Sequence, residues 1–182
     1  MIVIMAGLPG TGKSTVARAV AQRLRAAVLD KDVIRAALFA PGYVEYSPAQ
    51  DDFCQELMLQ TAAYLLAKHG SLDVILDGRT FSRQYQRDRV IEFCSQLGSA
   101  WAILECVCAE QTALGRLAEA VAHQTHLAAN RTPELYRQLR EAWEPIRSTK
   151  LIVDTDMPLE LCAERALCYL LDRKMEGRAD RV

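Results

Sequence analysis

One eight-residue segment constrains this chain more than any other feature of its sequence. Residues 7–14 read GLPGTGKS and match the pattern GxxxxGK[ST] at every fixed position. The segment follows a short apolar run, Ile2–Ala6, and opens a stretch of helical periodicity that begins at Lys13. A strand, a glycine-rich turn and a helix in this order form a loop whose backbone N–H groups turn inward around phosphates. The motif therefore predicts a phosphate-binding loop (P-loop) and an α/β fold.

Each part of this motif has its own expected role. The glycines permit backbone conformations that other residues rarely adopt, and Lys13 would reach the outer phosphates of a nucleoside triphosphate. Ser14 would offer its hydroxyl to Mg²⁺, which keeps water on most of its other positions. The residues expected to bind the nucleotide are Gly7, Leu8, Pro9, Gly10, Thr11, Gly12, Lys13, Ser14 and Thr15.

The rest of the chain alternates short apolar runs with longer segments of helical period, which is typical of a parallel sheet covered by helices. Strands are predicted at Ile2–Ala6, Ala27–Leu29, Val74–Leu76, Ala100–Val107 and Leu151–Val153. Helices are predicted at Lys13–Leu24, Val33–Phe39, Pro48–Lys68, Ser82–Gln96, Gln111–Ala120, Pro133–Ala142 and Pro158–Lys174. A capping box of Ser47 and Gln50 and a cap at Thr132 mark two helix starts. We therefore expect a three-layer α/β/α P-loop fold with a five-stranded parallel sheet, similar to nucleoside monophosphate kinases.

Length and charge set the expected domain organisation and partners. The chain has 182 residues, 51% of them apolar, which suits one globular domain. We expect that domain at residues 1–175, with a small helical lid at about 114–132 and a polar tail at 176–182. The 22 basic and 23 acidic residues give a net charge of −1. This balance produces no overall field that would attract nucleic acid or an anionic membrane, so neither is a favoured partner.

The cysteines and the apolar runs favour a cytoplasmic location. The six cysteines lie in apolar runs without CxxC or Cys/His spacing, so we expect reduced thiols in the core. No apolar run reaches the roughly 20 residues that span a bilayer, and no signal-type segment opens the sequence. A cytoplasmic location is the resulting expectation.

Two other classes of P-loop protein have residues that this chain lacks. A GTPase of the Ras type reads guanine with an Asn-Lys-x-Asp segment, which does not occur. A motor ATPase usually places a water-activating glutamate after its second acidic strand end, whereas here Asp77 is followed by Gly78. Asp77 itself follows a buried strand and suits an outer-sphere role toward Mg²⁺. An ATP-dependent kinase is therefore favoured.

The segment after the second predicted strand suits an acceptor site, because its exit opens on the same crevice as the P-loop. Asp32 is the candidate general base that takes the proton of an acceptor hydroxyl. Arg35 lies three residues on, on the same helix face, and suits a phosphate, a carboxylate or the aspartate itself. Asp30 is the candidate helix cap. Arg79 is a further candidate acceptor contact near the third strand's exit.

Two further segments complete the expected site. The candidate lid contains Arg116 and Arg131, either of which could neutralise charge on the transferred phosphoryl group. Its histidines lack a partner at metal-ligand spacing, so we expect solvated residues there. Tyr43 and Tyr46 are expected to shape a small acceptor pocket.

The combination of these segments resembles the P-loop kinases of the AAA_33 type, which are related to polynucleotide kinase, gluconate kinase, chloramphenicol phosphotransferase and zeta toxins. The resemblance rests on residues 7–15, 29–35, 74–78 and 153–160. It implies that Asp32 and Arg35 are the general base and acceptor-phosphate ligand, and that the loop around Thr155 borders the adenine. This family often carries two nearby arginines in its lid helix, whereas this chain has Arg116 followed by Ala120–Ala122.

Three functions remain open at this point. The first is an ATP-dependent phosphotransferase that acts on a hydroxyl of a small molecule, with Mg²⁺ as cofactor. The second is a 5′-hydroxyl nucleic-acid kinase that uses the same residues. The third is a nucleotide-dependent binding or regulatory module without transfer activity. The fold does not choose among acceptors, because one framework serves many of them.

Overall fold

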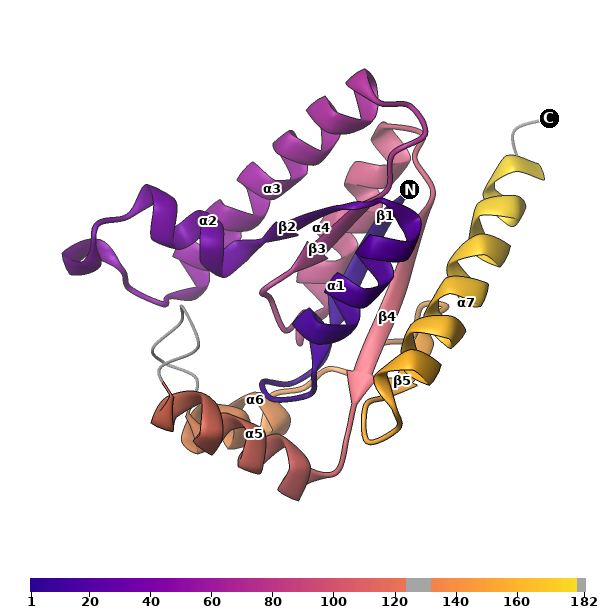
Figure 1. The fold of residues 1–182 in the computed structure, drawn as a ribbon. Helices are drawn as coiled ribbons and strands as arrows, with labels where there is room; N and C mark the ends of the chain where they lie inside the picture. The colour runs from indigo at the N-terminus through magenta and orange to yellow at the C-terminus, as the bar shows by residue number, and fades with distance from the viewer. Residues whose placement is uncertain (124–131, 180–182) are drawn as a thin grey trace.

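The computed structural model describes residues 1–123 and 132–179, and its centre is a parallel sheet (Figure 1). The strands are β1 Ile2–Ala6, β2 Ala27–Asp30, β3 Val74–Asp77, β4 Trp101–Val107 and β5 Leu151–Asp154. Their order across the sheet is β2-β3-β1-β4-β5, and every neighbouring pair is parallel. The predicted strands are all present, each within one residue of its predicted ends.

The predicted helices are also present in the described part of the chain. They are α1 Lys13–Leu24, α2 Lys31–Leu38, α3 Pro48–Lys68, α4 Gln84–Gln96, α5 Glu110–Ala122, α6 Pro133–Glu141 and α7 Leu159–Ala179, with a 3-10 turn, η1, at Pro41–Tyr43. Helix α7 continues five residues beyond the predicted end at Lys174. The prediction stopped there because the sequence becomes polar, and the exposed end of a helix is polar for the same reason.

The helices cover both faces of the sheet, as the three-layer fold requires (Figure 1). Side chains of β1 alternate between the two faces, so that Val3 and Met5 pack against α1 and α7. Ile2 and Ile4 pack on the opposite face, among residues of α3 and α4. Because both faces are buried, each strand can be apolar along its whole length. This two-sided core holds the carboxyl ends of the strands in fixed positions.

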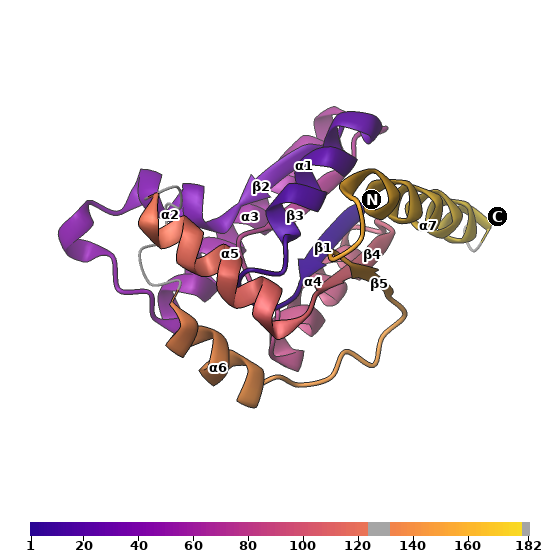
Figure 2. The same ribbon diagram turned by 60° about the horizontal axis from the view of Figure 1, so that its bottom comes forward.

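Helices α5 and α6 do not cover the sheet but lie together beyond the carboxyl ends of its strands (Figures 1 and 2). A small separate cluster of Ala113, Leu117 and Tyr136 joins them. Thr132 caps α6 as predicted, since its hydroxyl accepts a bond from the Leu135 N–H at 3.2 Å. Helices α5 and α6 therefore lie next to the P-loop, at the carboxyl ends of the strands.

The starts of α2 and α3 are each fixed by a side-chain cap. Asp30 ends β2 and accepts bonds from the N–H groups of Asp32 and Val33, so α2 begins at Lys31, earlier than predicted. Ser47 caps α3 as predicted. The predicted reciprocal half of that capping box is wrong. The Gln50 side chain instead accepts from the Glu45 N–H and donates to the Tyr43 carbonyl, which ties down the preceding loop.

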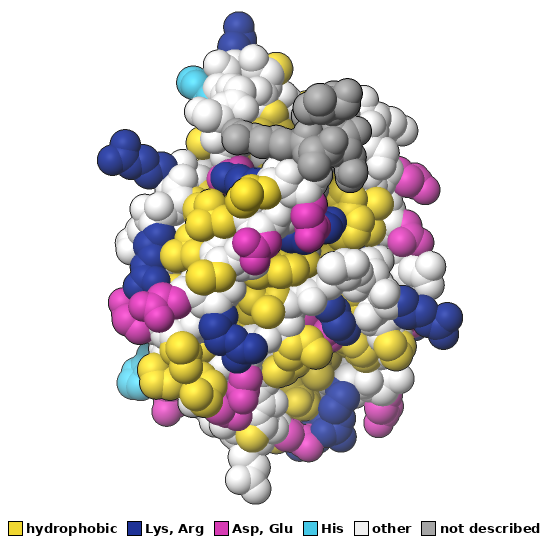
Figure 3. All heavy atoms as spheres, turned by 90° about the vertical axis from the view of Figure 1, so that its right-hand side faces the viewer, with side chains coloured by type: hydrophobic (Ala, Val, Ile, Leu, Met, Phe, Trp, Pro, Cys, Tyr) yellow, Lys and Arg dark blue, Asp and Glu magenta, His cyan; other side chains and the backbone are white. Residues whose placement is uncertain are grey.

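The side of the molecule on which α7 and β5 lie shows apolar side chains interspersed with charged ones (Figure 3). Exposed apolar residues of β5 and α7 include Ile152, Leu171 and Met175. No helix in the described part of the chain is long and apolar enough to cross a membrane.

The cysteines follow the predicted core pattern with two exceptions. Four are buried, namely Cys54, Cys94, Cys106 and Cys162. Cys168 is exposed and Cys108 is half-buried, so the expectation that all six are core residues is wrong. Cys168 lies on the outer face of α7, where an apolar run in the sequence does not distinguish the inner from the outer face. Burial raises the pKa of Cys94 and of Cys106 to about 12.

This difference predicts the order of thiol reactivity. The thiolate is the reactive form, so a pKa raised from 9.0 to about 12 leaves Cys94 and Cys106 protonated at neutral and mildly basic pH. Titration of the folded protein with an aromatic disulfide reagent at pH 8 should modify Cys168 first and the buried thiols only after denaturant is added. Rapid modification of all six thiols in the native protein would contradict the described core.

Candidate functional site

The P-loop has the backbone conformation that its glycines predict. Gly7, Gly10 and Gly12 have φ angles of 141°, 78° and 77°, in the range that side chains disfavour. A Cβ on Gly7 would lie 2.4 Å from the Cys106 carbonyl oxygen, because the loop packs directly against the end of β4. The loop therefore turns from β1 into α1 only with glycine at these positions. The result is a backbone cradle at the amino end of α1, which favours an anion.

Lys13 lies within this cradle. Its ammonium donates hydrogen bonds to the carbonyls of Gly7 and Leu8, at 2.9 and 2.8 Å, and the residue is buried. A buried ammonium held by two carbonyls is a cation placed where phosphate oxygens would enter the loop. Ser14, the next residue, is half-buried, and Thr15 is exposed at the start of α1.

Asp77 ends β3 next to the P-loop and is buried, with one carboxylate oxygen, Oδ1, that has no hydrogen-bond partner among the described residues. Its neighbour in the sheet register is Asp30. Burial, together with the nearby Asp77 carboxylate, raises the pKa of Asp30 above its usual value. A buried, unpartnered carboxylate oxygen near a second carboxylate fits a cation, so Asp77 suits the predicted Mg²⁺.

Asp32 and Arg35 are both buried and form the ion pair that their spacing allowed, with 3.0 Å between Arg35 Nη1 and Asp32 Oδ1. Lys31 Nζ lies 3.5 Å from the same carboxylate oxygen. Sequence reasoning missed the fourth member of this cluster, Asp51 of α3, whose Oδ1 contacts Arg35 Nη2 and lies 2.9 Å from Lys31 Nζ. The Arg35 guanidinium also lies over the Tyr46 ring, 5.0 Å from its centroid.

Arg79 is buried beside this cluster, not on the surface. Its guanidinium donates to Gln55 at 2.6 Å and to the Asp52 carboxylate at 2.5 Å, so α3 holds it from two sides. The residue before it, Gly78, has a φ of 82°, and a Cβ there would lie 2.5 Å from Asp30 Oδ1. The turn after β3 therefore fits closely against the turn after β2.

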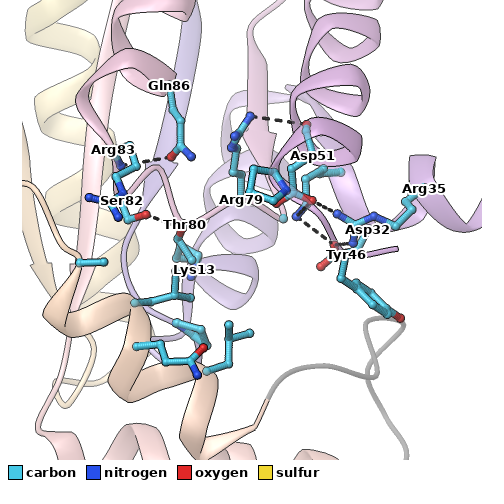
Figure 4. Close-up of a pocket in the computed structure, with 18 of the residues that line it drawn as sticks. Lys13, Asp32, Arg35, Tyr46, Asp51, Arg79, Thr80, Ser82, Arg83 and Gln86 are labelled. Carbon is cyan, nitrogen blue, oxygen red and sulfur yellow. Dashed lines mark hydrogen bonds and ion pairs between the residues drawn. The ribbon is translucent and has the colours of Figure 1, made fainter. Parts of the chain in front are cut away.

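A cavity of about 480 Å³ joins these groups (Figure 4). Lys13 lines it from the P-loop, Asp32 and Arg35 from α2, Asp51 from the start of α3, and Arg79 from the turn after β3. Part of its remaining wall was not predicted from the sequence and comes from α6 and its C-cap, through Leu135, Gln138, Leu139 and Ala142. Helix α6 thus encloses the site, although its sequence carries no recognisable motif.

The two tyrosines predicted to shape the pocket have different positions. Tyr46 lines the cavity, with a φ of 52°, and places its ring beside Arg35. Tyr43 is 74% exposed and does not line it, because η1 turns its side chain toward solvent. The prediction for Tyr43 is therefore wrong.

Arg116 of α5 lies on the other side of the P-loop. It donates to the carbonyl and the hydroxyl of Thr155, at 2.8 and 3.0 Å, and to the Gly10 carbonyl at 3.4 Å. The Thr155 hydroxyl lies 3.0 Å from the Thr11 carbonyl. The loop after β5, helix α5 and the P-loop therefore meet at one point. Arg131, the other lid candidate, lies outside the described residues.

Comparison of sequence models assigns the chain to a family. The model of AAA_33, an AAA domain, matches residues 2–127, which is more than half of the chain. This chain belongs to the AAA_33 family. The resemblance seen in the sequence is thereby confirmed. A comparison with curated proteins gave no match.

Solved structures with the same fold as this AAA_33 protein include kinases. APS kinase CysC of Mycobacterium tuberculosis, in complex with AMPPNP and APS, has a TM-score of 0.70 and 20% identity, over 93% of this chain and 96% of that one. A gluconokinase from Sinorhizobium meliloti 1021 has a TM-score of 0.66 and 18% identity, over 93% and 91% of the two chains. Kti12 of Chaetomium thermophilum, in complex with ADP-AlF3, has a TM-score of 0.69 and 14% identity, over 95% and 98%. These likenesses show the three-layer P-loop fold.

The close approach of Gly78 to Asp30 leads to a prediction. Gly78→Ala should lower the free energy of unfolding by about 2 kcal/mol, because the methyl group would be strained at this φ and would clash with Asp30 and the start of α2. Gly70→Ala is the matched control, since a Cβ there meets nothing within 4 Å. Urea unfolding of both variants measures the difference, and equal midpoints would contradict the described turn.

Proposed function

We propose that this protein transfers the γ-phosphate of ATP to a hydroxyl group of a small-molecule acceptor. The observation that carries the proposal is that Lys13 of the P-loop and Asp32 of α2 line the same cavity. A triphosphate in the loop and a hydroxyl beside Asp32 would then be neighbours. The kinase fold of the AAA_33 family supports the proposal, and the cavity of about 480 Å³ suits a metabolite.

The proposed reaction uses each group in turn. The acceptor oxygen attacks the γ-phosphorus, the new O–P bond forms, and the bond to the bridging oxygen of ADP breaks. Asp32 takes the proton that the acceptor hydroxyl loses. Lys13 and the backbone N–H groups of residues 7–15 hold the phosphates in position. Mg²⁺, held by Ser14 and by Asp77 through water, would neutralise charge on the phosphates.

The remaining site residues take supporting roles in this proposal. Arg35 and Arg79 form the acceptor side of the cavity, and Thr155 borders the nucleotide from the loop after β5. Arg116 remains our candidate for stabilising charge on the transferred group. To reach it, the guanidinium would exchange its bonds to Thr155 and Gly10 for phosphate oxygens. We further propose that a segment at about residues 114–132 acts as the lid, and that the protein is one cytoplasmic kinase domain over residues 1–175.

The first test concerns the nucleotide. Lys13→Ala should weaken Mg·ATP binding by about 100-fold or more, because the cation within the P-loop is removed. Lys68→Ala is the control, since Lys68 is exposed at the far end of α3. Isothermal titration calorimetry with Mg·ATP measures both affinities. Unchanged affinity in Lys13→Ala would remove the P-loop from the proposal.

The second test concerns transfer. A screen of hydroxylated metabolites, followed by coupled detection of ADP, should find an acceptor that increases ATP consumption. With that acceptor, Asp32→Asn should lower kcat by about 10²–10⁴ because the general base is lost, while Mg·ATP affinity is kept. An unchanged kcat would exclude Asp32 as the base. ATP binding without consumption across the screen would favour a binding or regulatory module.

A further inference from the structure

The cations of the acceptor side are all engaged by carboxylates. Besides Lys13, the cavity is lined by Lys31, Arg35, Arg79 and Arg83. These four cations pair with four carboxylates. The ion pairs are Lys31–Asp32, Lys31–Asp51, Arg35–Asp32, Arg35–Asp51, Arg79–Asp52 and Arg83–Glu144. Among the described residues, the charges on this side of the cavity therefore balance.

Asp51 pairs with two cations of the cavity wall that would attract an anionic acceptor. It lies in the first turn of α3, where the helix dipole favours a carboxylate, and one of its oxygens contacts both Lys31 Nζ and Arg35 Nη2. Both cations are buried, whereas the Asp51 side chain is 24% exposed and lines the cavity. A carboxylate of the protein thus lies beside these two cations in the cavity wall.

Arg35 has its terminal nitrogens committed in this arrangement. Nη1 donates to Asp32 and Nη2 to Asp51, and the Tyr46 ring stacks beside the guanidinium. A phosphate or carboxylate is gripped by two parallel N–H groups of a guanidinium. Here each terminal nitrogen of Arg35 already donates to an aspartate, and Nε, which has no hydrogen-bond partner among the described residues, is buried. An anion at this wall would have to displace Asp51 or lie against two carboxylates, and like charges in such a site repel strongly.

We infer that Asp51 is a specificity-determining residue. It excludes anionic groups from the acceptor side of the cavity and selects an uncharged, hydroxyl-rich acceptor. The cavity also presents Thr80, Ser82, Gln86 and Gln138, whose hydroxyl and amide groups suit the hydroxyls of such a molecule. Arg35, in this view, positions Asp32 and Asp51 and does not bind an acceptor phosphate. The inference rests on the proposed function and names the class of its acceptor.

The experiment uses inorganic phosphate as the anionic probe. The protein is first saturated with Mg·AMPPNP, so that the P-loop is occupied, and phosphate is then titrated by calorimetry into wild type, Asp51→Asn and Glu56→Gln. The asparagine keeps the shape of Asp51 and removes its charge. Glu56 provides the matched control, because it lies on the same helix and pairs with Arg89 outside this cavity.

Asp51→Asn should bind phosphate at least about tenfold more tightly than wild type, and Glu56→Gln should behave as wild type. If Asp51→Asn binds phosphate no more tightly than wild type, the inference is overturned while the proposed kinase function is left intact. Failure of all three proteins to bind Mg·AMPPNP would instead overturn the proposed function, and the inference with it.

Discussion

The structure depends first on the turn between β1 and α1. Gly7 packs so closely on the carbonyl of Cys106 that no side chain fits, and this contact joins the P-loop to the end of β4. Gly10 makes a similar approach to α5, where a Cβ would lie 2.5 Å from the Ala113 carbonyl oxygen. The phosphate cradle is therefore wedged between a central strand and the helix that carries Arg116. Its shape is set before any nucleotide enters, which is the condition for electrostatic preorganisation.

Beside this cradle the cavity wall contains several buried charged side chains. Burying an ion pair stabilises a protein little, because desolvation offsets most of the attraction between the charges. The cluster of Lys31, Asp32, Arg35 and Asp51 is therefore explained better by what it does at the cavity than by stability. Its ion pairs hold Asp32 in place, and in the proposed function the same charges face the acceptor.

The degree to which the sequence predicted the fold differs between local and distant features. Helix α3 was predicted with both ends correct, since Ser47 and Pro48 mark its start through contacts within one turn. The start of α2 was missed by two residues although its cap, Asp30, had been identified. Cys168 was misplaced because an apolar run does not show which face of α7 meets the sheet. The α2 error concerns a boundary set by the local cap, whereas the Cys168 error concerns orientation, which the neighbouring elements determine.

The sequence by itself determined the P-loop and the five strands, because each follows from residues close together in the chain. It also allowed, among other partners for Arg35, the pairing with Asp32 that the structure contains. Only the tertiary structure decided that Asp51 joins this pair, that α6 closes the cavity and that Arg116 meets Thr155. These contacts join residues that are far apart in the chain. Asp51 and Arg35 are 16 positions apart, and Arg116 and Gly10 are 106 positions apart. No local periodicity or spacing carries information on them, since they exist only after the sheet brings its carboxyl ends together.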